Sequence, residues 1–453
     1  MTAARARTPR PGRVAVPAPV EQPATAVRIV RALGVAAVVI TPVIISTLGL
    51  ETFRIPKELF ATAAALSILP FLPLVLSERF LERLRNDAAP VVVACMSLAW
   101  IAFCGARMNH PTSNETVVAA WSAPIVFVAF LVSAQYRTLH LLYWLAIPAG
   151  ANTIVLILER ALAWSPFKII DIEGTRPATA LLGNGNDIGM TLFIATVAFI
   201  ALAIVEVRPM WHVAAALLAI FFGAGVIFSY TVTALAALAT SMFMFAILRI
   251  EKRAHRVVLA AVLLSVPVVV IGLVPGLRHR FISAYENARA HRYNELLSNR
   301  LEPSLAAIEM FRAQPITGLG PAAFDTYYFD YKLKVDQKYR TLMPEDMAEW
   351  SKGRLINFSE THNEYLQIAA ELGTVGVLLF LAGLVVIGSR SLMRSKGAED
   401  DCARFARTVA LPLASGFAVL CIAQFPFRIA APRVLMTAVT ALVIGWTPGR
   451  HES

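Results

Sequence analysis

Residues 188–206 read IGMTLFIATVAFIALAIVE, an apolar run with no charge before its final glutamate. A helix rises 1.5 Å per residue, so a run of this length crosses the roughly 30 Å hydrocarbon core of a bilayer. Similar blocks recur along the 453 residues, of which 57% are hydrophobic and only 16% charged. An ordinary soluble domain is about 25% charged, so the composition excludes a soluble enzyme. The chain is predicted to be an all-α polytopic membrane protein.

The apolar blocks predict about twelve transmembrane helices, nine within residues 29–274 and three within 365–447. Residues 275–364 form one large polar loop between them, and residues 1–28 are predicted to be a disordered, basic cytoplasmic tail, because five arginines lie there among Pro and Ala. The expected spans are near residues 29–50, 57–76, 89–105, 117–134, 139–158, 188–206, 211–229, 231–249, 256–274, 365–388, 406–424 and 432–447.

The basic residues indicate the orientation. With the tail inside, the termini and inner loops hold 21 of the 41 Lys and Arg, and the short outer loops hold eight. Short inner loops of membrane proteins are enriched in Lys and Arg. The net charge of +11 is therefore an orientation signal. The large loop holds equal numbers of acidic and basic residues, so no nucleic-acid surface is expected.

The large outer loop has a helical signal of its own. Leu301, Leu305, Ile308 and Phe311 recur at helical spacing, and the stretch from Pro315 to Gly320 ends the element. Loops of this length usually carry function or have internal structure. This loop is the predicted location of the site.

Several kinds of chemistry are not expected. The sequence lacks a phosphate-binding P-loop, an H-E-x-x-H zinc motif and a G-x-S-x-G elbow. No metal or other cofactor is predicted, because seven of the eight histidines lack a ligand partner at helical spacing. The cysteines Cys95, Cys104, Cys402 and Cys421 show no C-x-x-C spacing and are expected to be packed thiols.

His362 is the candidate general base. It lies where the large loop enters the tenth span, and an imidazole with a pKa near ~6.5 can accept a proton from a sugar hydroxyl. The neighbouring Asn363 and Glu364 are candidate substrate-binding residues, and Glu364 shares a helix face with Glu371. An interfacial histidine that caps a helix or faces water, with solvated glutamates, is the alternative interpretation.

Arg300 is the second candidate, just before the predicted helix. A guanidinium at a helix N-terminus suits phosphate oxygens. The alternative is a surface arginine paired with Glu302. On the same outer side, Arg176 precedes the polar cluster of Asn184, Asn186 and Asp187, which can bind sugar hydroxyls or cap the sixth span.

These motifs together resemble the core of the O-antigen ligase and Wzy-type polysaccharide polymerase superfamily. The resemblance covers roughly residues 170–446, with its core in 275–446. It rests on Arg300-Leu301-Glu302, on Phe311-Arg312 followed by the P-x-x-G-x-G from Pro315 to Gly320, on Thr361 to Leu366, on the E-x-G-x-x-G from Glu371 to Gly376 and, more weakly, on Gly183 to Leu192 and Gln424 to Phe427.

The resemblance implies a glycosyltransferase of the bacterial inner membrane whose site faces the periplasm. Such enzymes move a glycan from undecaprenyl diphosphate to an acceptor hydroxyl without metal. His362 then corresponds to the general base and Arg300 to a diphosphate ligand, with Arg312 in the substrate-binding set. The implied partners are the bilayer, the lipid-linked donor, a glycan or lipid A-core acceptor, a flippase and a chain-length regulator.

One position departs from the family pattern. Many members carry a second diphosphate-binding arginine in a Ser-Arg-Gly-like motif, whereas Val232 occupies that position here. Arg176, Arg278 or Arg280 can supply the missing charge, and Arg176 is the preferred substitute.

The resemblance leaves the product open. Polymerisation of a surface polysaccharide (O-antigen, capsule or exopolysaccharide) is the first interpretation. Ligation to the lipid A-core of lipopolysaccharide and O-linked glycosylation of protein are the alternatives. A transporter also suits twelve spans, but the sequence shows no clear repeat symmetry, and its spans are nearly free of charge, with the polar candidates gathered at one outer edge.

Overall fold

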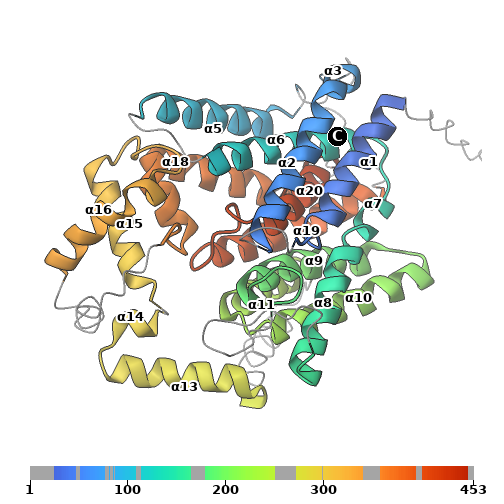
Figure 1. The fold of residues 1–453 in the computed structure, drawn as a ribbon. Coiled ribbons are helices and arrows are strands. Elements are labelled where there is room, and N and C mark those ends of the chain that lie inside the picture. The colour runs from blue at the N-terminus through green and yellow to red at the C-terminus, as the bar shows by residue number, and fades with distance from the viewer. Residues whose placement is uncertain are drawn as a thin grey trace, which may run out of the picture.

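The computed structural model describes residues 25–46, 52–76, 81, 85, 87–108, 114–164, 179–249, 272–297, 299–339, 358–393 and 400–446. In this part of the chain every regular element is a helix, and eight helices are long and apolar enough to cross a membrane. Shorter apolar helices follow at Ser122–Ala134 and Ala430–Trp446. The chain is an all-α polytopic membrane protein, as its composition predicts (Figure 1).

Most helices follow the expected spans to within about five residues, but the first helix, Thr25–Ile40, ends ten residues before the expected end of the first span. The expected spans 29–50 and 57–76 correspond to α1 and to α2 with its continuation, while most of the span expected near 256–274 lies outside the described residues. The helices are α1 (Thr25–Ile40), α2 (Arg54–Ile68), η1 (Leu69–Phe71), α3 (Leu72–Val75), α5 (Ala88–Ala106), α6 (Asn114–Ala134), α7 (His140–Tyr143), α8 (Ala146–Leu162), α9 (Gly185–Val205), α10 (Pro209–Phe228), α11 (Val232–Arg249), α13 (Pro275–Arg289), α14 (Tyr293–Leu296), α15 (Leu301–Ala313), α16 (Ala323–Lys338), α18 (Glu364–Ser389), η2 (Arg390–Leu392), α19 (Asp401–Leu420) and α20 (Ala430–Trp446).

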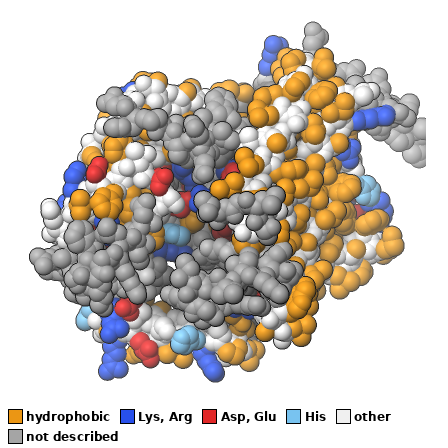
Figure 2. Space-filling view, viewed as in Figure 1, with side chains coloured by type: hydrophobic (Ala, Val, Ile, Leu, Met, Phe, Trp, Pro, Cys, Tyr) orange, Lys and Arg blue, Asp and Glu red, His pale blue; other side chains and the backbone are white. Residues whose placement is uncertain are grey.

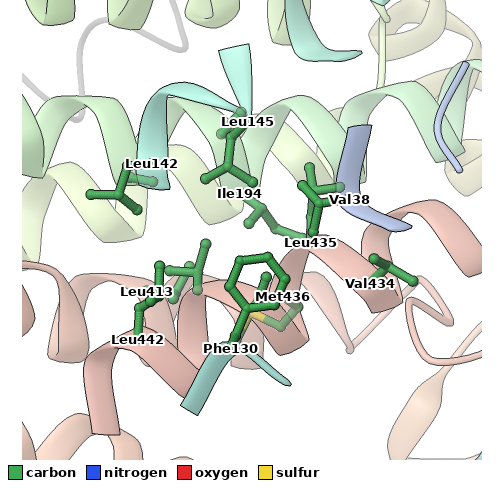
Figure 3. Packing of buried hydrophobic residues seen from close by; sticks show 14 of the residues in the cluster. Val38, Phe130, Leu142, Leu145, Ile194, Leu413, Val434, Leu435, Met436 and Leu442 are labelled. Carbon is green, nitrogen blue, oxygen red and sulfur yellow. The ribbon is translucent and has the colours of Figure 1, made fainter. Parts of the chain in front are cut away.

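The central helix is α9, the run quoted first. In its most apolar window 83% of the residues are buried, against 11% in α5, because α9 is enclosed by protein while α5 lies at the edge of the bundle. Ile194 of α9 packs among side chains of α1, α6, α19 and α20, such as Val38, Phe130 and Leu435 (Figure 3). Elsewhere large apolar side chains cover much of the surface, as expected for helices in contact with lipid (Figure 2).

Contacts between helix ends agree with the predicted alternation of the spans. At the ends expected inside, Arg137 pairs with Asp400, and Arg390 pairs with Asp87 at 2.5 Å. At the ends expected outside, Arg433 pairs with Glu58. Ends predicted to share a side of the membrane are therefore in contact in the structure.

The polar segment contains the predicted helix. It is α15, which begins at Leu301 and ends at Ala313, before Pro315. Its buried Ala306 and Met310 form a second hydrophobic core with Phe324 and Tyr328 of α16. This core extends to Ala370, so α15 and α16 pack on the start of α18 (Figure 1).

The tenth span is interrupted, whereas an unbroken helix is expected from its apolar run. Gly373 has φ 65° and ψ −166°, a conformation essentially confined to glycine. The interruption exposes backbone groups, and the P-x-x-G-x-G loop binds them: the N–H groups of Leu319 and Gly320 donate to the carbonyls of Ala370 and Glu371 at 2.9 and 2.8 Å. The P-x-x-G-x-G and E-x-G-x-x-G motifs are thus joined by backbone hydrogen bonds.

Candidate active site

His362 lies immediately before the N-terminus of α18. Asn363 caps this helix, its side-chain oxygen accepting the N–H of Leu366 at 3.1 Å. His362 itself has a positive φ of 55°, which turns the chain into the helix. Its ring meets Phe425 edge-on, with centroids 4.7 Å apart, and Phe358 at 6.2 Å. The imidazole is therefore held between aromatic rings.

The imidazole of His362 has an unusual electrostatic environment. Its Nδ1 is buried and has no hydrogen-bond partner among the described residues. Burial and the positive charge of Arg300 lower the pKa of His362 to about 4. The negative charge of Glu360 opposes this shift only in part. The ring is thus neutral at pH 7 and can accept a proton, and it lies near enough to Arg300 for the two to interact electrostatically.

Arg300 precedes α15 and reaches the connection between α19 and α20. Its Nη1 donates to the carbonyl oxygen of Ala423 at 2.9 Å. Glu302 does not neutralise it, because that carboxylate binds Lys332 at 2.6 Å and accepts the hydroxyl of Tyr328. Burial and the charge of Arg280 lower the pKa of Arg300, so its environment disfavours a lone cation. An anion would relieve this cost.

Two further cations gather around Tyr230, two residues before Val232. The guanidinium of Arg160 lies 4.2 Å from the centre of the Tyr230 ring, and Arg280 Nη1 donates to the Tyr230 carbonyl at 3.0 Å. Arg280 also interacts electrostatically with Arg300 and Arg160. The structure therefore places Arg280, from α13, close to Val232, for which a substitute cation is expected from the sequence. Arg176, the preferred substitute, lies outside the described residues.

The polar cluster at the start of α9 has mainly capping contacts. The exposed Asn184 caps the helix, its side chain accepting the N–H of Asn186 at 2.8 Å. Asp187 is buried and interacts electrostatically with Arg54 and Glu360. The residue before α11, Thr231, contacts this cluster, because its Oγ1 donates to the Gly185 carbonyl at 2.8 Å.

Arg54 connects the polar cluster at the start of α9 to the residues just before His362. Its Nη2 donates to Glu360 Oε1 at 2.6 Å, and Glu360 lies two residues before His362. The sequence interpretation did not include either residue. Their positions in the sequence could have identified them. Glu360 directly precedes Thr361 of a recognised motif, and Arg54 stands at the outer start of a predicted span.

Arg312 is not brought to the other candidates. It lies at the last turn of α15, twelve residues after Arg300, or about 18 Å along a helix. Its Nη1 donates to Glu309 at 2.6 Å and to the hydroxyl of Tyr339 at 2.9 Å. These contacts give Arg312 a local role at the surface.

Glu364 and Glu371 are both buried, so they are not solvated as the alternative interpretation supposes. The Glu364 N–H donates to the Cys421 carbonyl at 2.9 Å, which attaches α18 to the α19–α20 connection. Glu371 pairs with Arg428 and accepts the N–H of Ala322 at 3.0 Å. Arg428 is a further residue that the sequence interpretation missed, although it directly follows the Gln424 to Phe427 stretch.

A chain of hydrogen bonds links this ion pair to the histidine segment. Gln367 Nε2 donates to Glu371 Oε1 at 2.7 Å, and Gln367 Oε1 accepts the Thr361 N–H at 2.8 Å. The Thr361 hydroxyl in turn donates to the Asn363 carbonyl at 2.6 Å. The conformation of the chain on both sides of His362 is thereby held by buried polar contacts.

The described residues contain no group of three or more His, Cys, Asp or Glu side chains placed to hold a metal ion. The four cysteines are free thiols, with Cys95 exposed and the others buried. What the site offers instead is a neutral imidazole, three arginines and buried carboxylates. Figure 2 shows basic, acidic and histidine side chains together in a hollow near the middle of one face.

Comparison with known proteins relates part of the chain to a described family. Residues 213–381 match a family model described as O-antigen ligase. The matched region runs from α10 through the polar segment into α18, and it includes Arg280, Arg300 and His362. A search of curated proteins gives no match.

Proposed function

From the relationship of residues 213–381 to the O-antigen ligase family, which supports a membrane enzyme that transfers glycans, we propose that this protein transfers an undecaprenyl-diphosphate-linked glycan to an acceptor hydroxyl. The proposed site faces the periplasm of a bacterial inner membrane, and the first candidate product is a polymerised surface polysaccharide. The observation that carries the proposal is that His362, whose Nδ1 has no hydrogen-bond partner among the described residues, lies within electrostatic reach of Arg300, which in turn interacts with Arg280.

The residues have separate roles in this reaction. Arg300 and Arg280 bind the oxygens of the donor diphosphate and stabilise the negative charge that develops as it leaves. His362 accepts the proton of the acceptor hydroxyl as its oxygen bonds to the anomeric carbon of the donor sugar. The bond from that carbon to the diphosphate breaks, and undecaprenyl diphosphate leaves with the bonding electrons. The proton on His362 then passes to water.

Glycans from a deletion strain would identify the product. For a polymerase, we expect surface glycan with single repeat units in place of long chains, because initiation and attachment remain intact. Accumulation of free lipid-linked polymer would instead identify a ligase, and loss of glycan from protein an O-linked protein glycosyltransferase. An unchanged ladder of surface polysaccharide on a gel, with no change in protein glycosylation, would contradict glycan transfer. It would favour a membrane transporter instead.

Arg280→Ala is expected to weaken donor binding. Removing a charge-assisted contact to phosphate costs about 1.5–3 kcal/mol, so the apparent KM for the donor should rise roughly 10- to 100-fold. Arg280→Lys should restore part of the affinity, because the charge remains. Steady-state kinetics with purified lipid-linked donor would measure this. Arg278→Ala, on the same helix, is the matched control, and an equal effect of both substitutions would contradict a specific role for Arg280.

The pH dependence follows from the pKa of His362. Because burial and Arg300 lower that pKa to about 4, the neutral base persists well below pH 6. At limiting donor concentration, where the rate reports the free enzyme, we expect activity to fall only as pH decreases through the region near pH 4. Initial rates measured from pH 3.5 to 8 would test this. An acid limb at the ordinary histidine pKa of ~6.5 would contradict it.

A further inference from the structure

The start of α2 is anchored beside the segment that leads into α9. Lys57, which is buried, donates from Nζ to the carbonyls of Ile44 at 2.7 Å and Phe53 at 3.1 Å. The Phe53 ring lies directly against Gly183, where a Cβ would come within 2.6 Å of it. The first turn of α2 is therefore fixed at the outer side of the bundle.

This anchoring places Arg54, the first residue of α2, beside Glu360. Arg54 Nη2 donates to Glu360 Oε1 at 2.6 Å, and the other carboxylate oxygen accepts the Ser359 hydroxyl at 2.6 Å. The side chain of Glu360 is only 10% exposed. Because an unpaired buried charge is costly, a carboxylate so far withdrawn from water needs a cation. Arg54 supplies this cation from 306 residues away in the chain.

Other charges surround Glu360 without neutralising it. Asp187 of α9 and Glu364 of α18 interact with it electrostatically, but both side chains are acidic. Arg428 interacts with it as well, yet the guanidinium of Arg428 is bound to Glu371. Among the described residues, the arginine of α2 is therefore the cation that binds this carboxylate directly.

Glu360 in turn acts on the imidazole two residues later. The charged groups that interact with His362 are Glu360 on its own segment and Arg300 before α15, while Phe358 and Phe425 pack on its ring. The carboxylate acts to raise the pKa of His362, against burial and Arg300. A cation bound to the carboxylate weakens this effect, so the ion pair favours the neutral imidazole.

We propose that Arg54 is a positioning residue of the active site, which binds Glu360 and so fixes the chain that leads into His362 and keeps the imidazole neutral. The inference rests on the proposed function for the role of His362 as a base. Arg54 lies outside residues 213–381, so the site includes a residue from the part of the chain that precedes the family match. The second helix then contributes to catalysis as well as to the packing of the bundle.

The pKa of His362 tests this inference directly. Full-length protein with isotope-labelled histidine, in nanodiscs of phosphatidylethanolamine and phosphatidylglycerol, would be titrated by NMR, with the signal assigned by its absence from His362→Asn. Arg54→Gln leaves the Glu360 charge without its partner and should raise the pKa of His362 by about 1. Arg54→Lys should keep it near 4, because the cation remains. Arg54→Gln combined with Glu360→Gln removes both charges and should restore it.

Arg433→Gln is the matched control. It breaks another ion pair of α2, between Arg433 and Glu58, and should leave the pKa of His362 unchanged whatever its effect on the unfolding temperature. If Arg54→Gln does not fold, Glu360→Gln tests the same coupling, because loss of the carboxylate should lower the pKa of His362. An unchanged pKa in a folded variant of either residue, or an equal shift in Arg433→Gln, would overturn the proposal.

Kinetics separates positioning of the base from binding of the donor. At pH 7, Arg54→Gln should lower kcat about 10- to 100-fold, as expected for a base displaced by about 1 Å, and leave the KM for the lipid-linked donor unchanged. A raised KM with an unchanged kcat would show that Arg54 acts on the donor, against the positioning role. Failure of the proposed function would look different, since the histidine titration would still shift in a protein without glycan transfer.

Discussion

His362→Asn should lower glycan transfer by about two to four orders of magnitude, the usual contribution of a general base, with the protein still present in the membrane. Asparagine tolerates a positive φ better than most residues, so the backbone at 55° is preserved while the imidazole is removed. The measurement is the rate of product formation by purified protein, alongside its amount in the membrane.

The chain offers a close control for this substitution. His291 lies in the same polar segment and also has a positive φ, of 58°, but it contacts Tyr293 at the surface. His291→Asn should therefore leave the rate unchanged. Arg300→Ala should also abolish the product, whereas Arg292→Ala, which removes an exposed arginine paired with Glu295 at 3.5 Å, should not. Wild-type rates from His362→Asn or Arg300→Ala would refute the assignment.

Gly373→Ala should have the largest effect on stability. A Cβ at this position would lie 2.2 Å from the carbonyl oxygen of Ile316, and the backbone conformation is one that alanine rarely adopts. The conformation alone costs about 1–3 kcal/mol, and the clash adds to it by forcing apart the α18 interruption and the P-x-x-G-x-G loop. We expect a lower unfolding temperature and loss of activity together.

Gly383→Ala is the matched control on the same helix. Its Cβ meets nothing within 4 Å, so alanine there should be neutral or stabilise the helix slightly, by about 0.5–1 kcal/mol. The unfolding temperatures of the two variants would be compared in detergent, with the fraction of monodisperse protein measured as the temperature rises. Gly318→Ala should behave like Gly373→Ala, because its Cβ would lie 2.3 Å from the Glu371 backbone. Unchanged unfolding of both would contradict a rigid joint between the motifs.

The approximate positions of most helices were the most predictable features. The spacing of Leu301, Leu305, Ile308 and Phe311 predicted α15, and Pro315 marked where it could not continue. The interruption of α18 was not predicted, because one glycine in a long apolar run is compatible with an unbroken span. Only the docking of the Ile316 to Gly320 backbone beside Gly373 requires the chain to depart from a helix there.

The candidate site was predictable as residue types and not as contacts. His362 is conspicuous because it stands at the end of the polar segment, next to an apolar helix, and Arg300 because it stands just before the helix predicted within that segment. Arg312 was expected in the substrate-binding set but lies at the last turn of α15, in an ion pair with Glu309. Arg280 was only one of three substitutes for the residue missing at Val232, until its bond to Tyr230 distinguished it.

Composition and periodicity, which are local properties of the chain, were enough to determine a helical membrane protein, its approximate spans and the segment where charge is concentrated. The tertiary structure alone decided which charges meet, because Arg300 and its partner Ala423 are 123 residues apart and are joined only by the packing of the helices between them. The same packing buries His362 beside Arg300 and lowers its pKa, an effect of environment that no pattern along the chain contains.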